Sequence, residues 1–130
     1  CYSGAERMFE RTLEYAKERE AFGRPIGRFQ AIRHKFADMA TKIEAAKQLT
    51  HTVAWRFANG EYPVREISMA KLYAARVCDE VADECIQIMG GYGYMKEYEI
   101  ERAYRDQRLN RIGAGTDEIM LEVIGRSYGL

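Results

Sequence analysis

Apolar residues recur at three- and four-residue intervals along most of this chain, and that spacing limits the folds open to it. The longest case covers residues 29–58, where one apolar stripe consists of Ile32, Phe36, Met39, Ile43, Ala46, Leu49, Val53 and Phe57. Such a stripe lies along one face of an α-helix. No run alternates apolar and polar residues long enough to indicate a strand. The sequence therefore predicts an all-α fold.

Glycine and proline divide this pattern into separate helices. We expect helical segments at about residues 3–20, at 29–58, from Pro63 through Ile88, near 98–110, and from Thr116 onward. Long helices joined by short turns predict an antiparallel up-down bundle of about four helices. The last arm of this bundle is expected to be broken at Gly113-Ala114-Gly115, where two glycines interrupt the apolar pattern.

Composition narrows the class of protein. The 130 residues are 47% hydrophobic and 31% charged, which is typical of one globular domain covering residues 1–130. Twenty acidic residues balance twenty basic ones, so no summed field draws the chain to nucleic acid or anionic lipid. No apolar run approaches the roughly 20 residues that span a bilayer. We expect neither a nucleic-acid nor a membrane partner.

The residues that most often carry metal or covalent chemistry do not form a recognisable pattern. His34 and His51 are the only histidines and lack further ligands at metal spacing, so we expect no metal site. Cys78 and Cys85 are about 10 Å apart along one helix, too far for a disulfide, which indicates reduced thiols. No serine or cysteine nucleophile stands in an exposed turn, and covalent catalysis is therefore not expected.

Two glycine-interrupted segments, residues 87–94 and 111–119, stand at predicted helix ends and are open to two interpretations. Glycines and Thr116 are ordinary helix caps, with Asp117 and Glu118 suited to the first turn of a helix. Alternatively, the unpaired amides of these turns bind a phosphate or a carbonyl oxygen. Local chemistry alone does not decide between caps and a binding site.

Four stretches together carry a resemblance to a known family. They are REAFGRPIGRFQ at 19–30, QIMGGYGY at 87–94, YRDQR at 104–108 and IGAGTDEI at 112–119. In this order they resemble the successive motifs of acyl-CoA dehydrogenases, and the match corresponds to the C-terminal helical domain of that family. The chain begins at Cys1 inside a helical pattern, and we expect it to be a piece of a longer protein whose N-terminal and middle domains are absent here.

The resemblance implies an FAD-dependent oxidoreductase that converts an acyl-CoA thioester to a trans-2-enoyl-CoA with hydride transfer to FAD. It also implies electron-transferring flavoprotein as redox partner and a homotetramer built as a dimer of dimers. The expected compartment is the cytoplasm of a bacterium or the matrix of a eukaryotic organelle. Without its missing domains, the isolated chain is expected to be catalytically silent.

Site residues follow from the resemblance position by position. It implies FAD contacts by Arg19 and Gln30, and contacts to the FAD of a dimer partner by Gln87, Ile88, Met89, Gly90 and Gly91. It implies contacts to the cofactor of the same subunit by Thr116, Asp117 and Glu118. Ala114 and Gly115 are expected to line the thioester end of the substrate.

The catalytic base is the main departure from the family pattern. Many members carry glutamate directly before the Gly-Thr pair, and here that position is Ala114, which cannot accept a proton. The isovaleryl-CoA and long-chain branches, which the sequence at 112–116 resembles, take the base from the first helix instead. By that comparison the base lies upstream of Cys1, and this chain contains no catalytic residue.

Two other functions stay open at this point. A sister flavoenzyme on the same scaffold, of the nitroalkane oxidase or flavin monooxygenase type, would keep the flavin contacts and change the substrate. A non-enzymatic helical interaction module would use the glycine turns only as caps.

Overall fold

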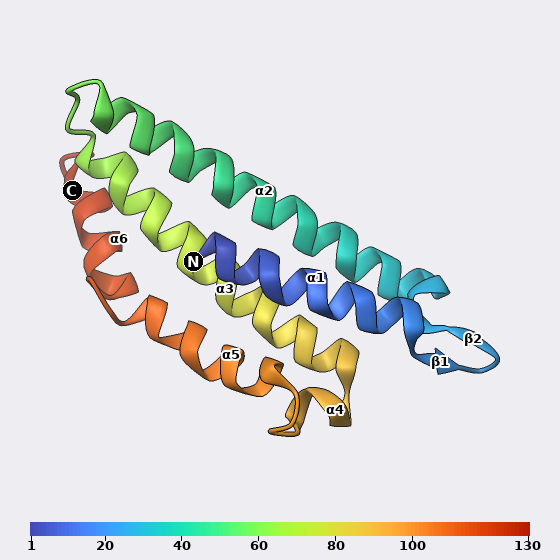
Figure 1. The fold of residues 1–130 in the computed structure, drawn as a ribbon. Helices are drawn as coiled ribbons and strands as arrows, with labels where there is room; N and C mark the ends of the chain where they lie inside the picture. Colours follow the sequence, from blue (N-terminus) through green and yellow to red (C-terminus); the bar gives the residue numbers. More distant parts are fainter.

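Three long antiparallel helices form the body of the computed structural model, which describes all residues from Cys1 to Leu130 (Figure 1). They are α1 (Tyr2–Glu18), α2 (Gln30–Ala58) and α3 (Val64–Met89). A fourth arm is assembled from shorter pieces: α4 (Gly91–Tyr94), α5 (Glu99–Arg108), a 3-10 turn at Leu109–Arg111 and α6 (Asp117–Arg126). The predicted all-α bundle with a broken last arm is confirmed.

The connection between α1 and α2 contains the only strands of the chain. Two-residue strands, β1 (Glu20–Ala21) and β2 (Arg24–Pro25), pair antiparallel, and a 3-10 turn at Ile26–Arg28 follows. Phe22 and Gly23 both have positive φ, 53° and 77°, which is the backbone of a tight two-residue hairpin turn. The sequence predicts only a turn here, because strands of two residues are too short to show an alternating pattern.

Helix α3 is the centre of the bundle. It packs against α1, α2, α5 and α6, so it is covered on several sides instead of along one stripe. One face of α3 buries an apolar stripe that consists of Ala70, Ala74, Val77, Val81, Cys85 and Ile88, and Ile67 at the start of this stripe is half-buried. Further residues around its circumference are also buried, namely Ser68, Leu72, Ala75, Cys78, Ala82 and Met89. Small side chains such as Ala75 and Ala82 allow the neighbouring helices to approach closely.

The two other long helices, α1 and α2, each bury one face. Met8 of α1 and Met39 of α2 are almost fully buried, and the rings of Phe9 and Phe36 meet edge to face at 5.4 Å. Thr12 is buried in the middle of the apolar face of α1 and points its hydroxyl at the sulfur of Met89. Phe57, at the end of the predicted α2 stripe, is instead 54% exposed.

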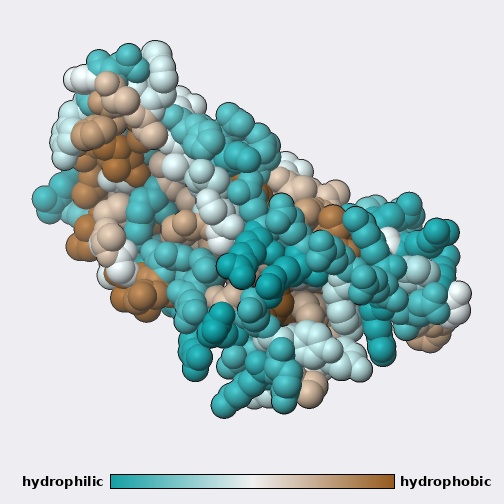
Figure 2. Space-filling view, viewed as in Figure 1, coloured by the Kyte–Doolittle hydropathy of each residue, from teal (hydrophilic) through white to brown (hydrophobic).

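The surface is polar over most of the face in Figure 2, with apolar side chains gathered at the end of the bundle that carries α6. Exposed apolar residues of this end include Ile119, Leu121 and Leu130. Gathered apolar surface of this kind commonly marks a contact with another subunit or domain. None of the helices combines the length and the apolar character required to cross a membrane.

Candidate functional site

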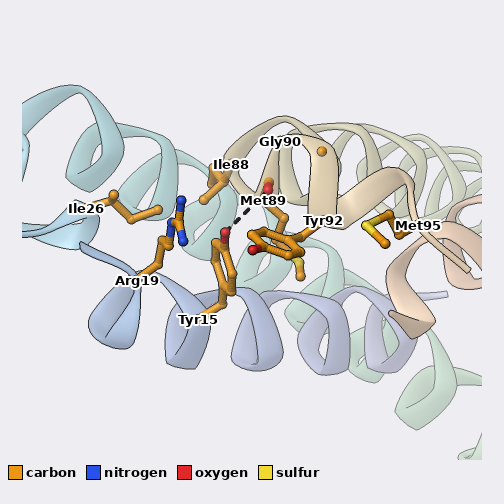
Figure 3. Close-up of a pocket in the computed structure, with 9 residues that line it drawn as sticks. Tyr15, Arg19, Ile26, Ile88, Met89, Gly90, Tyr92 and Met95 are labelled. Atoms are coloured by element: carbon orange, nitrogen blue, oxygen red, sulfur yellow. Dashed lines mark hydrogen bonds between the residues drawn. The ribbon is translucent and has the colours of Figure 1, made fainter. Parts of the chain in front are cut away.

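A cavity of about 570 Å³ opens where the end of α1 faces the break between α3 and α4 (Figure 3). Tyr15 and Arg19 come from α1 and its C-cap, and Ile26 comes from the turn after the hairpin. The other side consists of Ile88, Met89, Gly90, Gly91, Tyr92 and Met95. The cavity therefore gathers one cation, two aromatic rings and a glycine turn.

Glycine at position 90 makes the sharp break between α3 and α4. Gly90 has φ 59° and ψ −134°, a conformation that side chains disfavour, and its amide closes α3 on the carbonyl of Ile86. The backbone then turns so tightly that a Cβ on Gly93 would lie 2.8 Å from the Ile86 oxygen. The amides of Gly91 and Tyr92 donate no hydrogen bond within the chain. These amides are available to a ligand.

Aromatic rings and a guanidinium group line the same opening. The Arg19 guanidinium carbon lies 5.5 Å from the centre of the Tyr92 ring, and the rings of Tyr15 and Tyr92 meet edge to face at 6.1 Å. The Tyr15 hydroxyl points at the carbonyl of Met89, 3.5 Å away, which ties α1 to the end of α3 (Figure 3). Burial raises the pKa of Tyr15, with Arg19 opposing the shift. Tyr15 therefore stays neutral at physiological pH.

The second glycine break precedes α6 and also leaves amides unpaired. Ala114 and Gly115 have positive φ, 54° and 100°, and the amides from Ala114 through Asp117 donate no hydrogen bond within the chain. Thr116 caps α6 as predicted, because its hydroxyl oxygen accepts the Ile119 amide at 3.3 Å. The Lys71 ammonium group donates to the carbonyl of Gly115.

Asp117 is turned into the protein, where it meets two arginines. Its Oδ2 atom accepts from Nε of Arg76 at 3.1 Å and from Nε of Arg111 at 2.9 Å, and the residue is only 4% exposed. Burial alone would raise the pKa of Asp117, but the hydrogen bonds from both arginines outweigh it and hold the pKa below its usual value. Arg111 also donates to Asp79 at 2.8 Å.

The residues that the sequence assigned to a site fall into two groups. Arg19, Ile88, Met89, Gly90 and Gly91 surround the cavity, while residues 114–118 form the turn before α6 and the first two residues of that helix. Gln30 and Gln87 are exposed and do not line the cavity. Lys71 and Ile88 mark the two groups on α3, so about 25 Å of helix separates them.

The ion pairs around Asp117 were not foreseen in the sequence. The pairing of Arg111 with Asp79 depends on how α3 passes the last arm, which no local pattern in the sequence shows. Because the Asp117 carboxylate is buried and turned toward Arg76 and Arg111, any contact of this residue with a cofactor falls to its amide. The cofactor contacts inferred for the site residues remain predictions.

Comparison with known proteins identifies the family. The family described as "Acyl-CoA dehydrogenase, C-terminal domain" matches residues 1–129, and this chain belongs to it. A relative from Acetobacterium woodii, the caffeyl-CoA reductase-Etf complex subunit CarC, is 47% identical over 120 residues, which are 92% of this chain and 32% of that protein. The chain thus spans about a third of the length of such relatives.

Solved structures agree with this assignment. The crystal structure of a probable acyl-CoA dehydrogenase from Mycobacterium abscessus matches 98% of this chain and 34% of its own, with a TM-score of 0.96 and 49% identity. The FAD complex of PigA matches 99% of this chain and 34% of its own, with a TM-score of 0.94 and 32% identity. The family is one of flavin-binding oxidoreductases.

Replacing Asp117 tests the buried ion pairs. We expect Asp117→Ala to lower the free energy of unfolding by about 2 kcal/mol, less than for a fully buried pair because both guanidinium groups are partly in water. Asp117→Asn keeps an oxygen for both arginines and should cost less. The free energies come from urea denaturation. Asp38→Ala, which removes an exposed partner of Lys42, is the control and should cost under about 1 kcal/mol.

The lowered pKa of Asp117 also predicts how the free energy of unfolding changes with pH. A carboxyl whose pKa is lower in the folded chain stabilises it fully above the unfolded pKa of about 3.9 and loses this effect as pH falls through the folded pKa. The difference in unfolding free energy between wild type and Asp117→Asn should therefore stay constant from about pH 7 to 5 and shrink below about pH 4. A difference that does not change with pH would contradict the ionised pairing.

Proposed function

We propose that this chain is the C-terminal, FAD- and substrate-binding domain of an acyl-CoA dehydrogenase that forms a trans-2-enoyl-CoA from an acyl-CoA thioester. Family membership supports the reaction class. The observation that carries the cofactor assignment is the cavity in which Arg19 faces the glycine turn at Gly90 and Gly91. Because the chain spans about a third of its relatives, the activity belongs to the longer protein.

The donor set of the cavity fits a flavin dinucleotide. A pyrophosphate requires positive charge and hydrogen-bond donors, which the Arg19 guanidinium and the unpaired amides of Gly91 and Tyr92 supply. The rings of Tyr15 and Tyr92 offer apolar faces to a flat ring system. The volume of about 570 Å³ holds part of such a cofactor, not all of it. Other parts of the protein would cover the rest.

The separation of the two groups of residues supports a subunit-bridging arrangement. About 25 Å of α3 lies between Ile88, which lines the cavity, and Lys71, which contacts the turn before α6. We propose that the cavity group serves the FAD of a partner subunit and that Thr116 and Glu118 serve the FAD of their own subunit. The exposed apolar residues of α6 fit a protein that assembles in this way, and we propose a dimer of dimers.

The turn before α6 has the chemistry to hold the reacting end of the substrate. Amides of Ala114 and Gly115 are unpaired and are suited to a carbonyl oxygen that gains negative charge when the α proton leaves. FAD, when bound, accepts the hydride from the β carbon. Ala114 provides no proton acceptor, and we propose that the base is a glutamate of a segment that precedes Cys1.

The name of one relative favours a second direction for the same chemistry. CarC is named as a subunit of a caffeyl-CoA reductase-Etf complex, so that protein is described as a reductase. Reduction of a 2-enoyl-CoA uses the same site in reverse. We propose electron-transferring flavoprotein as the redox partner in either direction, and the redox potential of the substrate pair decides which direction dominates.

Arg19 provides the test of the cofactor assignment. In the full-length protein, Arg19→Ala should weaken FAD binding about tenfold or more, because a charge-assisted contact to phosphate is lost in a partly enclosed site. Titration of FAD into the apoprotein measures this. Arg24→Ala is the control, since Arg24 lies on the hairpin over the Phe29 ring and does not line the cavity. Unchanged affinity in Arg19→Ala would refute the assignment.

Activity separates the proposed enzyme from its alternatives. We expect an acyl-CoA to bleach the flavin absorbance of the full-length protein without oxygen, and the isolated 130 residues to give no turnover with an artificial electron acceptor. Bleaching by a nitroalkane instead of an acyl-CoA would indicate a sister flavoenzyme. A full-length protein that purifies without flavin and binds none would favour a non-enzymatic helical module. Turnover by the isolated chain would refute the upstream location of the base.

A further inference from the structure

The backbone of the turn from Ala114 to Thr116 is not stabilised by hydrogen bonds of its own amides. Ala114 has φ 54°, a left-handed conformation that costs an alanine about 1 kcal/mol or more, and Gly115 follows with φ 100°. The amides of the turn form no hydrogen bonds with the chain. Such a conformation persists only where the surroundings impose it. We therefore looked to side-chain contacts for what keeps the turn in this conformation.

Two attachments connect the turn to α3. Lys71 donates to the carbonyl of Gly115, inside the turn, and Arg76 donates to Asp117, directly after it. Both donors stand on one long helix that packs on α1, α2, α5 and α6. The turn is thus fastened to the most constrained element of the bundle.

A third side-chain contact links the residues on either side of the turn. Arg111 precedes the turn and Asp117 follows it, and their side chains join at 2.9 Å. Arg111 is fixed in addition by Asp79 of α3 at 2.8 Å. The other carboxylate oxygen of Asp117, Oδ1, is buried and has no hydrogen-bond partner. Arg76 and Arg111 are therefore the only hydrogen-bond partners of this carboxylate.

We propose that Lys71, Arg76, Arg111 and Asp117 are positioning residues that fix the backbone amides of residues 114–116 toward the reacting end of the substrate. The inference rests on the proposed function, since it assigns these side chains a task at the same site. None of the four side chains needs to touch substrate or cofactor. Their effect is to hold the amides in place, and a displacement of about 1 Å at a reacting centre can cost about a hundredfold in rate.

Two conservative variants of the full-length, FAD-loaded protein test the positioning role. Lys71→Met removes the donor to the carbonyl of Gly115. Asp117→Asn removes the negative charge that pairs with Arg76 and Arg111 and so weakens these two contacts. For both we expect unchanged FAD content, kcat lowered about tenfold or more, and KM for the acyl-CoA changed less than threefold. Lys71→Arg keeps a cation at the same place and should restore most of kcat. Lys42→Met, whose lysine pairs with Asp38 and Glu80 away from the turn, is the control.

A second readout does not depend on activity. Trypsin cleaves after arginine in flexible backbone, and Arg111 is held in the native protein by Asp79 and Asp117. Release of the turn should speed cleavage after Arg111 about tenfold in Asp117→Asn, measured by mass spectrometry of the native protein. Lys42→Met should be cleaved there at the rate of the wild type.

The outcomes separate this inference from the proposed function. Slower kcat at constant FAD content together with faster cleavage after Arg111 supports positioning. Folded, FAD-loaded variants with kcat within twofold of the wild type would overturn it, and so would loss of FAD or cleavage at the wild-type rate. A wild-type protein that does not act on any acyl-CoA would refute the proposed function, while the cleavage experiment would still show whether these side chains hold the turn.

Discussion

The packing of α3 is the constraint on which the rest of the structure depends. Four helices cover it, and small buried residues such as Ala75 and Ala82 allow their close approach. Because α3 is held on several sides, the elements attached to it are fixed as well. Gly90 ends it beside the cavity, and Lys71 and Arg76 reach from it to the turn before α6. A single rigid helix thus positions both groups of candidate site residues.

The length of α3 has a functional consequence. Lys71 and Ile88, which mark the two groups of candidate site residues on α3, lie about 25 Å apart along the helix. In the proposed function, each cofactor site combines the cavity of one chain with the turn of another. Oligomerisation is then part of the proposed site itself, in agreement with the resemblance to acyl-CoA dehydrogenases. The apolar end at α6 is one surface available for such contacts.

Much of the fold could be predicted from local signals. The stripe from Phe36 to Val53 and the cap at Thr116 depend on helical periodicity and on hydrogen bonds within a few residues, which the sequence shows directly. The central place of α3 was not predicted, because burial on several sides depends on which helices become neighbours. The pairing of Asp117 with Arg76 joins residues 41 positions apart. No periodic signal reveals such a contact, and an exposed and a paired arginine look alike in a sequence.

The most direct measurement of the central claim is subunit complementation in the full-length protein. One variant carries Arg19→Ala and the other carries Thr116→Ala with Glu118→Ala, and each alone should retain little FAD. When both are co-expressed, a mixed dimer has one site with all changes and one with none. The account predicts that purified mixed dimers hold FAD at about half of their sites. Mixed dimers without FAD would show that both groups act within one chain, which contradicts the account.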